Sequence, residues 1–431
     1  MGTCKVHNVR FYNLEPQAIN CMAYDKDRRK LALSRADNSV EVWDVTFTPH
    51  IESTIPGHPE VSVESLVWCN GSLFGAGLQG LVNEFDLKNL SIKSSHPVTA
   101  GACWCIDVDR NTTRIAAGTE EGYINILALT EDGLNLEKLL DKQEGRILSL
   151  AWDSSGKFIA SGSIGAVRVW SVETGHALHR MTTGKQTNVL DTLVWCVAFA
   201  EDLTVISGDS RGKLTFWDGK LGCCIKSYQS HKADILTLCL SEDGKSVYCA
   251  GVDPLITNFE KIKMQSGFKD DVLGERNDTI TTWVRSFQRR LHDHDVRSLV
   301  SGKGNQLFSG GIDGYLGISS YPPKMLTKYP PVPQSKCIVL APKARCALFR
   351  FPERLELWRL GSTSNISQDD ENYSNIMRST GHPLPLLDAP SKAVELLSKD
   401  AEPIMECAVS EDAHWIAFST PYHFRIFHLV L

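Results

Sequence analysis

A chain of 431 residues with 42% hydrophobic side chains is long enough to bury a large core. Its net charge of −6 excludes strong non-specific attraction to nucleic acid through bulk charge, although local basic loops could still bind phosphate. The thirteen cysteines show no CxxC spacing, which argues against a zinc site and for reduced thiols in a cytosolic or nuclear compartment, most of them in the core.

The start of the chain is polar and lacks the apolar core of a signal peptide. It begins Met-Gly, but Val6 stands where a myristoylation motif has Ser or Thr. No stretch approaches 18 apolar residues. We therefore expect no signal peptide, lipid anchor or membrane span.

A repeat of short strands runs along the chain. Residues 194–218 show its pattern most clearly, with three runs rich in Val, Ile, Phe and Trp that are separated by Gly, Asp and Ser turns and end in Trp217-Asp218. This pattern predicts antiparallel strands and is typical of one blade of a WD-repeat propeller. Equivalent positions, mostly about 42 to 47 residues apart, predict seven blades: Trp43, Phe85, Leu127, Trp170, Trp217, Phe259 and Ser319.

The ends of the predicted ring need a closing device, because open sheet edges invite aggregation. Lys5–Phe11 alternates in polarity and precedes the first blade, so we expect it to supply the outer strand of the seventh blade. We expect the propeller to occupy residues 1–320, with a long loop at Lys261–Asp278 before a strand at Thr281–Phe287.

Five prolines between residues 321 and 334 predict a stiff linker. Residues 335–431 then carry two further partial repeats, which we interpret as the first two blades of an incomplete second propeller in a truncated two-propeller protein. The polar stretch at about 361–402 predicts a mobile or disordered insertion. The predicted fold class is therefore all-β.

Histidine and aspartate residues near the blade starts could suggest metal or acid–base chemistry, above all in Arg290–Asp295. The structural interpretation is stronger, because WD repeats use a histidine before the first strand to bind an aspartate in a turn. We expect this role for His294 with Asp313, and for His231 with Asp253; Gly57-His58 suggests the same device.

No catalytic motif is present: the sequence has no Ser nucleophile elbow, Walker loop or His-Glu-x-x-His. We therefore expect no enzyme activity, catalytic residue, metal, cofactor or small-molecule substrate.

Two basic clusters could contact RNA or a partner protein. The first is Arg28-Arg29-Lys30, and the second is Arg285, Arg289 and Arg290 beside the aromatic residues Trp283 and Phe287. The alternative for the first is a solvated turn, and for the second a blade strand with its aromatic side chains in the core and its arginines in water.

Specific segments resemble the cirhin family of WD-repeat proteins. They are Lys5–Phe11 (KVHNVRF), Arg146–Trp152 (RILSLAW), His294–Arg297 (HDVR) and, most specifically, Leu355–Ser362 (LELWRLGS). The resemblance implies a non-catalytic scaffold subunit of the small-subunit processome, in the nucleolus of the nucleus. It implies early pre-ribosomal RNA assembly and processing, support of ribosomal DNA transcription, and partners among other WD-repeat and helical-repeat subunits and pre-ribosomal RNA.

A substrate adaptor of a cullin-type ubiquitin ligase is the alternative function. Such adaptors typically carry Trp-Asp-x-Arg at a blade end, whereas Trp43-Asp44 and Trp217-Asp218 here continue without the arginine. The missing arginine makes the adaptor function the less favoured of the two alternatives.

Overall fold

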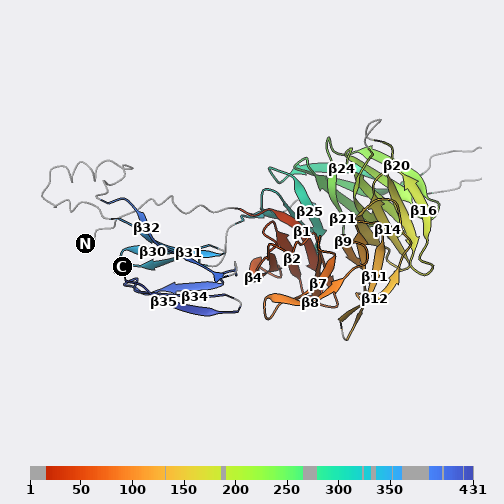
Figure 1. The fold of residues 1–431 in the computed structure, drawn as a ribbon. Helices are drawn as coiled ribbons and strands as arrows, with labels where there is room; N and C mark the ends of the chain where they lie inside the picture. The colour runs from red at the N-terminus through yellow and green to blue at the C-terminus, as the bar shows by residue number, and fades with distance from the viewer. Residues whose placement is uncertain are drawn as a thin grey trace, which may run out of the picture. The chain divides into compact units, whose positions relative to one another are not determined.

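The computed structural model describes residues 16–131, 133–185, 191–265, 279–322, 325–331, 336–351, 353–361, 388–399, 402–420 and 422–430. Within these ranges the secondary-structure elements are β-strands, paired antiparallel in nine sheets (Figure 1). The chain divides into two compact units, and Pro16–Pro331 form the larger one. Its seven sheets each contain four strands that follow one another in sequence.

The first four sheets of this unit hold strands β1 to β16. The first contains β1 (Ile19–Asp25), β2 (Lys30–Arg35), β3 (Val40–Asp44) and β4 (His50–Ile55). The second contains β5 (Ser65–Cys69), β6 (Ser72–Ala76), β7 (Leu81–Asp86) and β8 (Ser91–Pro97). The third contains β9 (Cys103–Val108), β10 (Arg114–Thr119), β11 (Ile124–Thr130) and β12 (Gly133–Leu139). The fourth contains β13 (Ile147–Trp152), β14 (Phe158–Ser163), β15 (Ala166–Ser171) and β16 (Ala177–Thr182).

The remaining three sheets of the unit hold strands β17 to β28. The fifth contains β17 (Val194–Phe199), β18 (Thr204–Asp209), β19 (Lys213–Asp218) and β20 (Cys223–Gln229). The sixth contains β21 (Ile235–Leu240), β22 (Ser246–Gly251), β23 (Leu255–Gln265) and β24 (Thr279–Arg290). The seventh contains β25 (Val296–Ser301), β26 (Gln306–Gly311), β27 (Leu316–Ser320) and β28 (Leu326–Tyr329).

The predicted marker positions occupy equivalent places. Each of the seven lies on the third strand of its sheet and pairs with a fully buried aliphatic residue of the second strand, as Trp43 does with Leu31 and Ser319 with Leu307. The prediction of seven four-stranded repeats is therefore confirmed.

The hydrophobic core lies between neighbouring blades. Each cluster of buried side chains in this unit draws on two neighbouring sheets, for example the third and fourth. Glycines in the second strands permit this approach: a Cβ on Gly118 would lie 2.7 Å from Ile147 Cγ2 in the next blade, and one on Gly208 would lie 2.6 Å from Ile235 Cγ2. Such distances are below van der Waals contact, so the small residues in these segments are a packing requirement.

The ring closes by packing of the first blade against the seventh. Ile19, Trp43 and Phe308 belong to one buried cluster, and a Cβ on Gly310 would lie 2.8 Å from Ile19 Cγ2, so this junction repeats the contact seen between the other blades. Arg35 adds a polar link, since its Nη1 donates to Gly314 O at 2.8 Å while its Nε pairs with Glu41 at 2.9 Å.

The fourth strand of the seventh blade differs from the prediction. It is β28, which pairs with β27 and lies inside the segment expected to be a linker. The physical reason is that the prolines stand on both sides of Leu326–Tyr329 and none within it, so its backbone N–H groups remain available for pairing. Lys5–Phe11, expected in that position, lies outside the described residues.

The second unit contains the described residues after 332. One sheet has β29 (Ile338–Ala341), β30 (Cys346–Arg350), β31 (Arg354–Arg359) and β32 (Ser391–Leu397), and the other has β33 (Glu406–Val409), β34 (Trp415–Ser419) and β35 (Phe424–His428). The expected insertion at about 361–402 therefore contains a paired strand, β32, whereas residues 362–387 lie outside the description.

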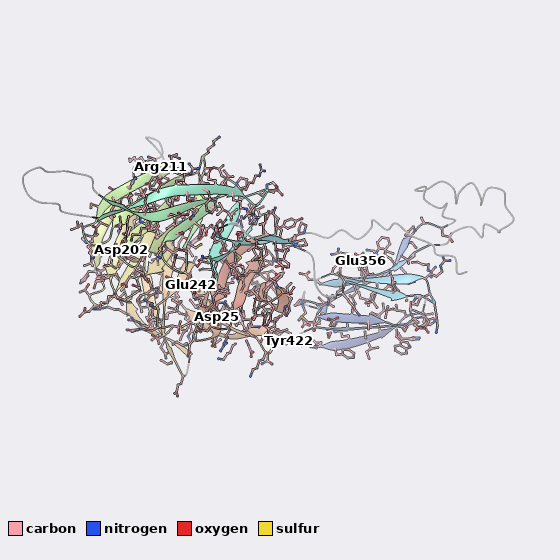
Figure 2. The ribbon with its side chains drawn as sticks, turned by 180° about the vertical axis from the view of Figure 1, so that it is seen from behind. Asp25, Asp202, Arg211, Glu242, Glu356 and Tyr422 are labelled. Atoms are coloured by element: carbon pink, nitrogen blue, oxygen red, sulfur yellow. The ribbon has the colours of Figure 1, made fainter. Side chains whose placement is uncertain are left out.

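The motif that resembles the cirhin family has a structural role. In Leu355–Ser362, Trp358 Nε1 donates to Glu356 Oε2 at 2.8 Å (Glu356 is labelled in Figure 2). Trp43 Nε1 makes the same bond to Glu41 Oε2 at 2.9 Å. A glutamate two positions before the tryptophan thus satisfies the indole N–H in both units.

Candidate nucleic-acid interface

The candidate interface lies on β24, the outer strand of the sixth blade. Thr, Val, Ile and aromatic residues favour a strand here, and β23 and β24 pair from Leu255 with Arg290 to Gln265 with Thr279. At 11 and 12 residues they are longer than the other strands of the unit. Since β24 ends the sheet order, one of its edges pairs with no other strand within the described ranges.

The aromatic side chains of β24 face the core. Trp283 is 5% exposed and stacks on Phe216 with ring centroids 5.1 Å apart. Phe287 stacks on Tyr321 at 5.0 Å. These rings already have protein partners, so they do not offer a stacking platform for bases.

The arginines of β24 differ in their exposure. Arg285 and Arg290 are exposed, and Arg289 is half-buried with its Nη1 buried and without a hydrogen-bond partner. Among the described residues, none of these three guanidinium groups forms an ion pair with a carboxylate. Guanidinium groups bind phosphate through several N–H donors, so this edge can accept a phosphate backbone.

The nearest ion pair on the same hairpin involves Lys261. Its ammonium group pairs with Asp202 in the fifth blade (Asp202 is labelled in Figure 2). This contact ties the long hairpin to the neighbouring blade.

The other basic cluster is engaged within the protein. Arg28 Nη1 donates to Gly71 O of the second blade at 2.6 Å. Lys30 Nζ lies 2.8 Å from Asp44 and 2.6 Å from Glu52. Burial opposes the charge on Lys30, but these two carboxylates raise its pKa overall. In the part of the chain that the structure describes, Arg29 alone of the three has no such contact, so this turn is a weaker candidate than β24.

The structural histidine of the seventh blade is His292. It is fully buried, its Nδ1 lies 2.9 Å from Asp313 Oδ2, and its Nε2 lies 2.8 Å from Ser309 Oγ. The prediction that His294 has this role is wrong, because His294 is exposed in the turn that leads to β25. Burial opposes ionisation of Asp313, but the hydrogen bond with His292 lowers the pKa of its carboxyl group overall.

The other two predicted histidines differ from one another. His231 is buried, and its Nδ1 lies 3.9 Å from Asp253 Oδ2, beyond hydrogen-bond range. Burial lowers its pKa, which favours the neutral ring. His58 is exposed, and its Nδ1 accepts the N–H of Glu60 at 3.2 Å. No described aspartate bonds to its ring, so the expected pairing is not found there.

Sequence reasoning missed Gln143, which takes the histidine position in the fourth blade. Its Oε1 accepts from Ser161 Oγ at 3.1 Å, and Ser161 Oγ accepts from Trp170 Nε1 at 2.9 Å. The signal was available in the spacing: Gln143, His231 and His292 each stand four residues before the first strand of the next blade. The same spacing excludes His294.

The cysteines behave as core residues. The twelve that the structure describes are free thiols, and most of them are buried. Burial raises the pKa of Cys103 and Cys249 to about 12, so these thiols stay protonated. Within the described ranges, no group of three or more His, Cys, Asp or Glu is placed to hold a metal ion. Nor do those ranges include a helix with the length and apolar character for crossing a membrane.

Comparison with protein families gives two matches. The anaphase-promoting complex subunit 4 WD40 domain matches residues 102–202, and the WD domain, G-beta repeat, matches residues 222–256. The seven four-stranded sheets and these two matches both indicate WD repeats. The larger unit is a WD-repeat β-propeller.

Several curated proteins are similar to the whole chain of this propeller protein. The U3 small nucleolar RNA-associated protein 4 homolog of Homo sapiens is 33% identical, over 100% of this chain and 61% of its own length. The U3 small nucleolar RNA-associated protein 4 of Saccharomyces cerevisiae is 27% identical, over 98% of this chain and 54% of its own length.

A more distant similarity is to Cell division cycle 20.6, cofactor of APC complex, of Arabidopsis thaliana, at 23% identity over 54% of this chain and 56% of that protein. The chain spans about three fifths of the length of the human relative.

Proposed function

We propose that the chain belongs to the family of U3 small nucleolar RNA-associated protein 4 and acts in nucleolar pre-ribosomal RNA processing. The observation that carries this proposal is the similarity to the human relative, 33% identity along the entire chain. The relatives are named for association with U3 small nucleolar RNA, which supports a place in the small-subunit processome.

Within that assembly the chain acts as a non-catalytic scaffold. A rigid ring of blades offers two faces and a rim whose loops and edges can vary without loss of the core. Its partners are other WD-repeat and helical-repeat subunits together with pre-ribosomal RNA, and its role extends to support of ribosomal DNA transcription.

Arg285, Arg289 and Arg290 provide the RNA contact in this proposal. Arg285 and Arg290 are exposed and Arg289 is half-buried, and among the described residues none of the three forms an ion pair. The aromatic side chains beside them pack in the core. Contact through guanidinium groups alone predicts binding to the RNA backbone with little sequence preference and with strong salt dependence.

The test of location and partners uses the tagged full chain in cells. We expect nucleolar fluorescence, and we expect processome subunits and pre-ribosomal RNA to co-purify after crosslinking. Recovery of ubiquitin-ligase subunits alone would contradict the proposal and favour the adaptor alternative.

The test of the RNA contact compares two sets of variants. Changing Arg285, Arg289 and Arg290 together to Gln should weaken binding of a 30-nucleotide single-stranded RNA by about tenfold or more and reduce the salt slope by up to about 2, since each phosphate contact contributes about 0.7. The control changes Arg28 and Arg29 to Gln. Equal losses in the two sets would refute the assignment to β24.

A further inference from the structure

A row of exposed apolar side chains lies at one end of the blades of the larger unit. The turn between the second and third strands of a blade begins with a residue whose N–H donates to a carbonyl just before the first strand. Val252 N donates in this way to Asp234 O, and Ile312 N to Asp295 O, both at 3.0 Å. Four consecutive blades, the sixth, seventh, first and second, have an exposed apolar residue at this turn position, and we call these residues the apolar row: Val252, Ile312, Ala36 and Leu78.

The turns that carry the apolar row belong to one continuous surface. Arg35 Nη1 donates to Gln17 O at 3.1 Å and to Gly314 O at 2.8 Å, which joins the turn of the seventh blade to the first blade. Asn38 Nδ2 donates to His58 O at 3.3 Å, which joins the turn of the first blade to the connection into the second. The sixth and seventh blades share a buried cluster of side chains. Exposed apolar side chains that gather on one surface mark a contact site, whereas isolated ones are common.

Carboxylates surround the apolar row. In the second-to-third-strand turns of these four blades, in the connections before their first strands and at the first two positions of those strands, seven exposed or half-buried carboxylates face two cations. The carboxylates are Asp37, Glu60, Glu64, Asp234, Asp253, Asp293 and Asp295, and the cations are Lys232 and Arg297. Arg290 ends β24 and therefore belongs to the outer rim of the sixth blade.

This excess of negative charge is not neutralised within the described residues, where none of the seven carboxylates lies within 4.0 Å of a lysine or arginine nitrogen. Asp253 lies 3.9 Å from His231, whose neutral ring is favoured by burial. Asp234 accepts from Trp195 Nε1 at 2.8 Å, and Asp37 accepts from the backbone of its own turn at 3.0 Å. Hydrogen bonds of this kind leave the charge of the carboxylate in place.

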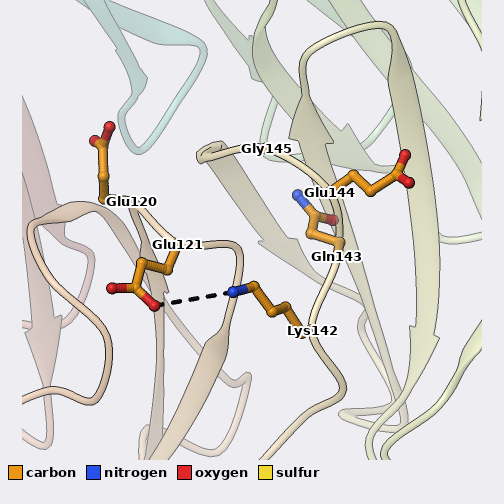
Figure 3. A pocket seen from close by; sticks show the side chains of 6 residues that line it. All are labelled: Glu120, Glu121, Lys142, Gln143, Glu144 and Gly145. Carbon is orange, nitrogen blue, oxygen red and sulfur yellow. Dashed lines mark ion pairs between the residues drawn. The ribbon is translucent and has the colours of Figure 1, made fainter.

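The same end of the third blade is built differently. Glu120 holds the position that is apolar in the row, since its N–H donates to Ala102 O at 2.9 Å. Its carboxylate lies 2.9 Å from Arg146, and Glu121 lies 3.9 Å from Lys142, the ion pair drawn in Figure 3. The carboxylates of the third blade are therefore paired with cations of the connection into the fourth. Both features of the row, apolar side chains and unpaired carboxylates, end at this blade.

The two features together select the class of partner. The negative charge repels a phosphate backbone and favours lysine and arginine side chains. The apolar row favours aliphatic side chains on the same molecule, because their contact removes apolar surface from water. A segment of a protein can carry both kinds of side chain.

We propose that the apolar row docks a segment of a partner protein that combines aliphatic and basic side chains. The aliphatic side chains pack on Val252, Ile312 and Leu78, and the basic ones face the surrounding carboxylates. This interaction goes beyond the RNA role proposed above and does not depend on it.

The experiment uses the full chain and three fluorescein-labelled nine-residue peptides that alternate Lys with Leu, Lys with Ser, or Glu with Leu. Fluorescence polarisation should show binding of the Lys-Leu peptide and at least about tenfold weaker binding of the other two. Equal binding of the Lys-Ser peptide would overturn the role of the apolar row, and equal binding of the Glu-Leu peptide would overturn the role of the carboxylates.

Two sets of variants separate this surface from the rest of the chain. Changing Glu60 to Gln and both Asp293 and Asp295 to Asn should weaken binding of the Lys-Leu peptide by about five- to tenfold. The matched control changes three exposed carboxylates in turns at the opposite ends of the strands to Gln: Glu131, Glu173 and Glu201. An equal loss in this control, which alters the net charge by the same amount, would overturn the proposal.

The apolar contribution is tested in the same assay. Changing Val252 and Ile312 together to Ser should weaken binding by about fivefold, whereas changing Phe47 and Leu221, exposed in turns at the opposite ends of the strands, should leave it unchanged. A Lys-Leu peptide with benzoylphenylalanine at its centre should crosslink to residues 36–39, 56–64, 77–80, 252–254, 291–295 or 312–315. Crosslinks mainly elsewhere would overturn the location, and displacement of the peptide by a 30-nucleotide RNA would overturn the assignment to a protein partner.

Discussion

Replacement of His292 by Ala should lower the free energy of unfolding of the propeller by about 3 to 5 kcal/mol. The ring is fully buried, and its removal takes the histidine partner away from the carboxylate of Asp313, 6% exposed, and from the buried hydroxyl of Ser309. An orphaned buried polar group costs about 1–3 kcal/mol, and the vacated volume adds about 1–2 kcal/mol. Asp313 keeps the N–H of Tyr315 at 3.2 Å, which places the expected loss toward the lower end.

The measurement is urea unfolding combined with amide hydrogen exchange in β25, β26 and β27. His294→Ala is the matched control, and its effect should stay below about 0.5 kcal/mol because the side chain is exposed. His292→Gln should recover part of the loss, since Gln143 fills the equivalent position in the fourth blade. Equal effects of the two alanine variants would refute the assignment of His292 as the structural histidine.

Two further substitutions test the interior and the closure of the ring. Burial raises the pKa of Asp107 from 3.8 to about 6, so the folded state prefers the protonated acid and its stability falls as pH rises from about 4 to about 6. Asp107→Asn keeps an acceptor for the N–H of Trp152 but removes the ionisable group. The free energy of unfolding, measured with urea, should therefore rise by about 1–2 kcal/mol at pH 7.5 and by less at pH 4.5. An increase that is the same at both pH values would contradict this cause. Arg35→Ala should lose about 2–4 kcal/mol and increase hydrogen exchange in β1 and β27, because it breaks the link to Gly314, whereas the exposed Arg110→Ala should change neither.

The repeat could be predicted because its determinants are local. A third-strand marker such as Trp217 needs only an alternating pattern, a turn and a fixed spacing, and each of these is visible in the sequence. The need for small residues in the second strands could also be predicted from the sequence. The partner that imposes it, such as Ile235 for Gly208, lies in the neighbouring blade.

The hydrogen-bond and ion-pair partners of the basic side chains could not be predicted in the same way. Whether Arg29 or Arg285 is free depends on carboxylates and carbonyls that other strands bring near, and Lys30 is neutralised by Asp44 and Glu52 from the next two strands of its own sheet. In the sequence, the aromatic and basic residues of β24 form one mixed cluster. The burial of Trp283 in the structure shows which side chains belong to the core and which can contact a partner.

The sequence by itself determined that this protein is all-β and that its larger part repeats one four-stranded unit seven times, because strand periodicity and turn chemistry act over a few residues. Only the tertiary structure decided that β28 completes the last blade, that His292 rather than His294 bonds Asp313, and that Gln143 bonds Ser161 in the fourth blade. The physical reason is that an edge strand and a buried polar pair are each defined by groups distant in sequence, whose approach depends on how the blades pack.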